Sequence, residues 1–207
     1  GGIWNAGLSL GSASQSLRVN SGGSALEFYT PSAGGVLQVK ETLYDTLNDF
    51  NNSTYNYINS NFKVDITPTA ADSKFLLEAN LSIGMSNHDC SCGFGFLDSQ
   101  VGVGDSNIIP PRNNESSGVG SRIQVSIGSH PGFAANSDPD NYWMISINFS
   151  TLYTPSSQNT NARSFYPSSK RGSYNGAMHL NYGQIDSTLN LAGVSMIRVS
   201  EIANGIT

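Results

Sequence analysis

The chain has 207 residues and a mass of 22.0 kDa, enough to bury a core without a disulfide scaffold. Charged residues make up only 12% of it, about half of the roughly 25% in ordinary soluble domains. The chain has a net charge of -5 and one adjacent basic pair, so its sequence lacks the basic clusters that bind the phosphate backbone of a nucleic acid. Its longest apolar runs are far shorter than the ~20 residues of a membrane-spanning helix. We therefore expect no nucleic-acid partner and no membrane insertion, and the 22 glycines argue against an all-helical fold.

Residues 1–35 are rich in glycine and serine, but short apolar pairs recur in them. The pairs are Leu8/Leu10, Leu17/Val19 and Leu26/Phe28. Spacing of two places both side chains on one face of an extended strand, while each pair is too small to form a core alone. Two interpretations stay open: a flexible linker, or an extended arm of small strands that pack only when several copies of the chain come together.

From Val36 onward, apolar and polar residues alternate with the period of two that is typical of half-buried strands. The expected strands lie at 36–39, 55–58, 62–67, 73–85, 93–97, 122–127, 143–153, 177–182 and 189–202. The last has apolar residues on both faces, which predicts a strand in the middle of a sheet. A helix over 37–50 is the alternative that the spacing of Leu43, Leu47 and Phe50 indicates, although this segment lacks a C-cap.

Short strands joined by Gly, Pro, Asn and Ser turns predict an all-β fold. We expect an antiparallel jelly-roll β-sandwich over residues 36–207, preceded by the arm of residues 1–35.

Four segments carry more specific motifs. They are Ser16–Phe28 (SLRVNSGGSALEF), Gly35–Val39 (GVLQV), Ile66–Leu77 (ITPTAADSKFLL) and Met196–Ala203 (MIRVSEIA). In this order they resemble the LxVNxxGTALEF linker, the GxVLQV opening, the ITPxSxxSKIL turn and strand, and the closing TLMEIAG of tail-fibre proteins of tailed bacteriophages, especially marine ones. Residues 86–176 match none of these motifs, so the resemblance carries no receptor over to this chain.

The resemblance implies a homotrimeric fibre tip with a jelly roll similar to the tumour-necrosis-factor-like trimer fold. It also implies a place on the virion, extracellular in the mature particle, among other virion structural proteins. The composition of the arm agrees with a trimer, because three copies can bury their Leu and Phe side chains along a common axis at about 25 cal/mol per Å² removed from water.

One cluster, His88-Asp89-Cys90-Ser91-Cys92, has the chemistry of metal ligands. His88, Cys90 and Cys92 can hold a soft cation such as zinc, but the usual zinc pattern has a second ligand pair elsewhere. A disulfide across one intervening residue is strained, because a strand places these Cα atoms nearer to about 7 Å than to about 5.5 Å. Structural or free thiols, a metal site and a disulfide all stay open, and no cofactor is expected.

Catalytic signatures are sparse. His179 has the context of a packed strand histidine, and Asp138-Pro139-Asp140 is first a turn signal rather than a glycosidase carboxylate pair. The sequence contains no phosphate-binding glycine loop before a helix. We therefore expect a protein that is not an enzyme.

Two long stretches, 104–120 and 154–176, have turn residues and little alternation, which predicts loops that are free to vary. The second combines cations with aromatic rings able to engage sugars, and its candidate receptor-binding residues are Arg163, Tyr166, Lys170, Arg171 and Tyr174. These loops can equally shield a seam between subunits.

Together these features predict a non-enzymatic, trimeric virion fibre protein that adheres to a host cell-surface glycan. A polysaccharide-degrading tail spike and a capsid-attached fibre without a receptor role are the alternatives.

Overall fold

A computed structural model of the chain describes residues 12, 16–20, 22–29, 35–85, 92–109, 127–129, 144–171, 178–182 and 192–204. All regular structure in these residues is β-strand, and every strand pair is antiparallel. The expected all-β antiparallel fold is therefore confirmed. Within the same ranges no helix has the length and apolarity needed to cross a membrane.

The first two strands, β1 (Ser16–Val19) and β2 (Leu26–Tyr29), pair with each other. The side-chain oxygen of Asn20 fixes their turn by accepting a hydrogen bond of 2.9 Å from the backbone N–H of Ser24. Gly23 has a φ of 67°, in the left-handed region that favours glycine. This hairpin confirms strands at the second and third apolar pairs of the arm, and the pair at positions 8 and 10 lies outside the described residues.

One sheet of the main body is built from six strands. They are β3 (Val36–Tyr44), β4 (Asn48–Phe50), β7 (Lys74–Met85), β10 (Met144–Tyr153), β12 (Met178–Leu180) and β13 (Ser195–Ile202). Strand β10 runs along one edge of β7, while β13 and then β12 follow its other edge. Strands β3 and β4 pair with β13 and β12 respectively, so β13 is an interior strand, as the sequence predicts. We call this the first sheet.

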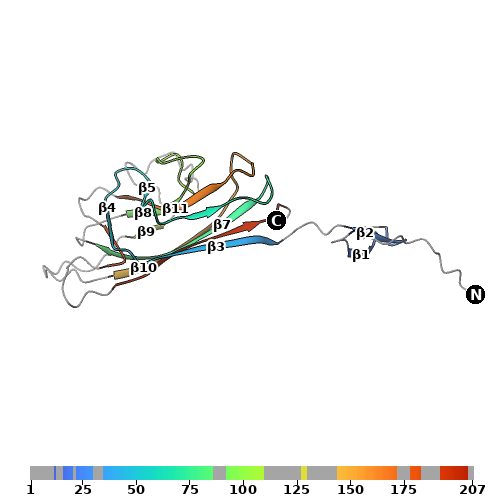
Figure 1. Cartoon of the computed structure of the whole chain (residues 1–207), viewed down its shortest axis with the longest axis horizontal. Coiled ribbons are helices and arrows are strands. Elements are labelled where there is room, and N and C mark those ends of the chain that lie inside the picture. Colours follow the sequence, from blue (N-terminus) through green and yellow to red (C-terminus); the bar gives the residue numbers. More distant parts are fainter. Residues whose placement is uncertain are drawn as a thin grey trace, which may run out of the picture.

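The second sheet contains five strands. They are β5 (Asn56–Tyr57), β6 (Val64–Ile66), β8 (Cys92–Asp98), β9 (Ile127–Ser129) and β11 (Arg163–Arg171). Strand β11 pairs with β8 on one side, and with β6 and then β5 on the other. Strand β9 pairs with the outer edge of β8. Figure 1 shows the two sheets packed on each other, with the β1–β2 hairpin beyond the start of β3.

Apolar side chains from both sheets meet between them and form the core. Alternate residues of β7 point inward, so Phe75, Leu77, Leu81 and Ile83 are all essentially inaccessible to solvent. Aromatic pairs join the sheets: the ring centroids of Phe75 and Phe165 lie 5.1 Å apart, and those of Phe96 and Phe149 lie 4.8 Å apart. The described strands confirm most of the expected ones, with bounds shifted by a few residues.

One alternative and one expectation from the sequence are wrong. Residues 37–50 form β3 and β4 rather than a helix. The stretch 154–176 is not one loop, because Arg163–Arg171 is strand β11 and only 154–162 of the described part is irregular.

Pro167 obscured β11 in the sequence, since proline cannot donate to a sheet ladder. The Pro167 carbonyl accepts a hydrogen bond from the N–H of Ile58, so the proline nitrogen lies on the side of β11 that pairs with β6 and β5. Pro167 lies between the residues that pair with these two strands, and the hydrogen bonds between β11 and β8 on the other side need no N–H from it.

Candidate functional site

A buried carboxylate ties the last described strand to the turn before β7. Glu201 of β13 is fully buried, and its Oε1 accepts hydrogen bonds from the Thr69 N–H at 2.7 Å and the Ser73 hydroxyl at 2.5 Å. Its Oε2 accepts from Gln38 at 2.6 Å. Burial opposes ionisation, but these donors outweigh it and hold the pKa of Glu201 below its usual value. All four residues belong to the motifs that carry the tail-fibre resemblance, so the motifs have a structural role here.

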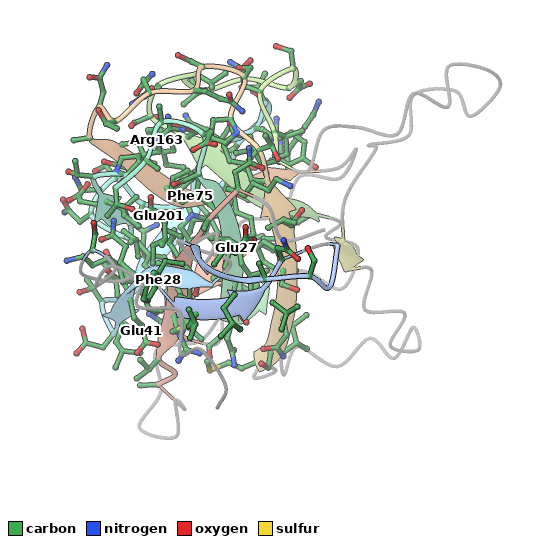
Figure 2. The ribbon with its side chains drawn as sticks, turned by 90° about the vertical axis from the view of Figure 1, so that its right-hand side faces the viewer. Glu27, Phe28, Glu41, Phe75, Arg163 and Glu201 are labelled. Atoms are coloured by element: carbon green, nitrogen blue, oxygen red, sulfur yellow. The ribbon has the colours of Figure 1, made fainter. Side chains whose placement is uncertain are left out.

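A second buried charge lies at the same end of the molecule. Arg163 and Asp98 are each 1% exposed and form an ion pair of 2.7 Å, and the guanidinium lies 5.4 Å from the ring centre of Phe75. Tyr153 donates to Asp98 at 3.3 Å, and burial together with the charge of Asp98 raises the pKa of Tyr153 to about 12. Figure 2 shows Arg163, Phe75 and Glu201 in the interior, whereas Glu41 lies at the edge. The expectation that Arg163 belongs to an exposed binding loop is therefore wrong.

The other predicted receptor-binding residues are separated by the strand geometry. Tyr166 lies in the middle of β11 and stacks on Tyr57, with ring centroids 3.8 Å apart. Lys170 forms an ion pair with Asp105, and Arg171 donates to Asn51 at 3.2 Å. Tyr174 lies outside the described residues. Of the proposed set, Tyr166 and Lys170 share the outer face of the second sheet, since they lie at alternating positions of one strand.

The predicted metal ligands are only partly described. Cys92 begins β8, is buried in the core, and its Sγ lies 3.5 Å from the carbonyl oxygen of Gly93. His88 and Cys90 lie outside the described residues, so the metal site stays a prediction. In the part of the chain that is described, no group of three or more His, Cys, Asp or Glu side chains converges.

A polar cluster that the sequence did not reveal surrounds His179. This histidine is buried in β12, as the sequence predicts, and its Nδ1 lies 2.6 Å from Oδ1 of Asp49 and 3.0 Å from the hydroxyl of Tyr182. Tyr182 also hydrogen-bonds to Asp49. Burial opposes ionisation of Asp49, but its bonds to Tyr182 and His179 lower its pKa, while burial and Asp49 raise the pKa of Tyr182 to about 12.

The geometry of this cluster fixes the imidazole ring rather than presenting it as a base. Nε2 of His179 is buried, without a hydrogen-bond partner among the described residues. A general base must reach the proton that it removes, and a buried Nε2 does not. Only the pairing of β12 with β4 brings His179 beside Asp49, which lies 130 positions away in the sequence.

Exposed apolar side chains gather on the outer face of the first sheet. The register places one row across four strands of this face, made of Val39, Ser200, Leu76 and Leu152. The neighbouring row on the same face, two residues further along each strand, is made of Glu41, Arg198, Glu78 and Ser150. Val39, Leu43 and Leu152 are 52%, 65% and 56% exposed. Arg198 forms an ion pair of 2.6 Å with Glu41 on the same face. Contiguous apolar patches on a protein surface are typical of interaction sites, so this face is a candidate contact surface.

The β1–β2 hairpin has an apolar face of its own. Leu17 pairs with Phe28 and Val19 with Leu26, so all four side chains lie on one side of the ribbon. Leu17, Val19 and Leu26 are each more than half exposed. A two-stranded hairpin on its own is marginally stable in water, which makes this face a second candidate contact surface.

Comparison with known proteins gives no relative: no protein-family model matches the chain, and no curated protein matches its sequence.

Proposed function

We propose that the chain is a non-enzymatic virion fibre protein of a tailed bacteriophage, a homotrimer that adheres to a glycan on the host cell surface. The body is a jelly roll of the tumour-necrosis-factor-like kind, and the arm joins the three copies. The observation that carries this proposal is the apolar face of the β1–β2 hairpin, which lies beyond β3 on the long axis of the molecule (Figure 1).

The order of the strands supports the jelly roll. The first sheet contains the strand row β3–β13–β7–β10, and the second sheet contains the row β6–β11–β8–β9. The chain crosses from one sheet to the other between most of these strands, as it does in the two Greek keys of a jelly roll.

The exposed apolar residues support self-association. Leu43, Val39 and Leu152 lie on the outer face of the first sheet, and the hairpin precedes β3 of that sheet in the chain. A three-fold axis along the arm therefore brings both apolar surfaces into contact with the same neighbours. Burying them removes the cost of exposing apolar area at about 25 cal/mol per Å².

The buried ionisable residues support a role without catalysis. Glu201, Asp98 and Arg163 are engaged in hydrogen bonds and ion pairs that hold strands together. A depolymerase of the tail-spike kind needs two carboxyl groups facing a substrate across about 5 to 10 Å.

Light scattering of the purified chain tests the assembly. We expect a mass about three times 22.0 kDa at micromolar concentration. A mass near 22.0 kDa contradicts the trimer.

Antibody labelling of virions then tests the role. Label at a fibre tip, with no new reducing ends from host envelope polysaccharide, is the expected result. Label on the capsid favours the structural fibre, and new reducing ends favour the tail spike.

A further inference from the structure

The outer face of the second sheet carries a pair of tyrosines. Tyr57 of β5 and Tyr166 of β11 stack with ring centroids 3.8 Å apart and planes inclined by 20°, and both are half-buried. Tyr57 is directly opposite Ser168, a small residue, so its ring packs diagonally against Tyr166. The stack presents apolar ring surface and two phenol groups at the surface of the molecule.

Hydrogen-bonding groups border this pair. Asp65 of β6 is opposite Ser164, and the register of β6 places Lys63 beside Tyr166. The Lys63 ammonium lies 2.9 Å from Oδ1 of Asp65, and the Ser164 hydroxyl donates to the same oxygen at 2.5 Å. The bonds from Ser164 and Lys63 lower the pKa of Asp65, so the carboxylate is ionised at neutral pH and its second oxygen still accepts. These five residues form the tyrosine patch: Tyr57, Lys63, Asp65, Ser164 and Tyr166.

We propose that the tyrosine patch binds a neutral saccharide, an inference that rests on the adhesive role proposed above. The tyrosine rings contact the apolar C–H face of the sugar, while the phenol groups, Asp65 and Ser164 form hydrogen bonds with its hydroxyl groups. Ligand sites typically combine apolar surface with a few well-placed polar groups in this way. The patch has no net charge because Lys63 is paired with Asp65, so it offers no free cation to an acidic sugar.

The position of the patch fits this role. It lies on the second sheet, whereas the exposed apolar rows lie on the first sheet. When copies associate through the first sheet, the tyrosine patches stay on the outside, one for each copy. Three patches on one particle raise the avidity for a repeating polysaccharide without any new contact.

The test applies the intact chain to a glycan array with neutral and acidic oligosaccharides, and follows its hits by titration. We expect binding to neutral glycans, weakened at least tenfold by Tyr57→Ala or Tyr166→Ala, because aromatic anchors dominate binding surfaces. Asp65→Asn lowers affinity, whereas Asp72→Asn, an exposed carboxylate in the turn before β7, leaves it unchanged. Tyr166→Phe keeps the ring and retains most of the binding.

Light scattering and circular dichroism of each variant separate loss of binding from loss of fold or assembly. Binding to acidic glycans alone, neutral binding that both alanine variants retain, or no binding to any glycan overturns this inference. A fall in mass of Tyr166→Ala also overturns it, by assigning the patch to a subunit contact. In each of these cases, a parent chain that forms a trimer and labels at the fibre tip leaves the proposed fibre role standing. Only the absence of binding to any glycan also removes the glycan receptor from the proposed function, so the two failures are distinguishable.

Discussion

At the scale of single residues, buried charge in this protein is matched by nearby donors. Among the described residues, no lysine or arginine is bonded to the carboxylate of Glu201. It accepts instead from the hydroxyls of Thr69 and Ser73, the Thr69 N–H and the Gln38 amide. Hydrogen bonds to an ionised group are stronger than those between neutral groups. Glu201 therefore holds the turn at 67–73 against β13 and β3.

The stability of the fold should depend on pH through Glu201. The folded state lowers its pKa below 4.5, so its contribution is present above that value and is lost as the pH falls through the folded-state pKa. We expect Glu201→Gln to cost about 1 to 3 kcal/mol at pH 7 and to flatten this part of the acid dependence.

Urea unfolding between pH 3 and pH 7 measures the effect. The exposed residue Asp45, replaced by Asn, is the control and should follow the parent chain. An acid dependence in Glu201→Gln equal to that of the parent contradicts the assignment.

At the scale of elements, the irregular segment of residues 99–109 packs against the outer face of β8 through Ile108. Leu97 points to that face and is fully buried, as is nearly all of Ile108. The backbone of Ile109 pairs with that of Phe96, with two hydrogen bonds of 2.9 Å. Gly95 faces this segment, and a Cβ there would lie 2.5 Å from Cδ1 of Ile108 and 2.9 Å from the carbonyl oxygen of Ile109.

Gly95→Ala should therefore destabilise the domain. The methyl group has to displace backbone as well as a side chain, which costs about 1 to 3 kcal/mol in a packed site. The midpoint of urea unfolding measures this cost. Gly35→Ala is the matched control, since a Cβ at Gly35 meets nothing within 4 Å and its φ is ordinary. Equal midpoints for the two variants would show that the segment yields without cost.

The sequence predicts elements better than it predicts the site. Alternation located β7 and β10 because one face of each strand is buried and apolar. Strand β11 was not predicted because Pro167, Ser168 and Ser169 interrupt the alternation of apolar and polar residues, although they pair with residues of β8. Tyr166 was expected to bind, but its neighbours Tyr57 and Asp65 lie about a hundred positions away and come beside it only through the register. Such a register depends on tertiary packing, which local periodicity does not encode.

At the scale of the whole molecule, the two outer faces differ in chemistry. The first sheet exposes the aliphatic side chains of Val39, Leu43 and Leu152, while the second sheet carries the tyrosine patch on its outer face. Such an asymmetry is typical of a subunit that presents one face to its neighbours and the other to its surroundings.

Replacing Leu43 by Asp should disrupt assembly while leaving the subunit folded. Leu43 is 65% exposed in one chain, and exposed substitutions change the stability of a lone domain by less than about 0.5 kcal/mol. A charge buried between copies is far more costly, so we expect the mass by light scattering to fall toward that of one chain. Val103→Asp, also at an exposed apolar residue but beside the second sheet, should keep the full mass. A full-sized assembly for Leu43→Asp would remove this face from the contact.

The place of β13 also governs when the fold can form. It lies between β3 and β7, and the Arg198–Glu41 pair across its edge joins positions 157 apart. During synthesis, β3 leaves the ribosome long before β13 has been made. Strand β3, with Val39 and Leu43, therefore stays unpaired until the rest of the chain has been synthesised. Non-local pairing of this kind makes folding slow, on the order of milliseconds to seconds. In the proposed trimer, we therefore expect the contact through the first sheet to form only after β13 has been synthesised.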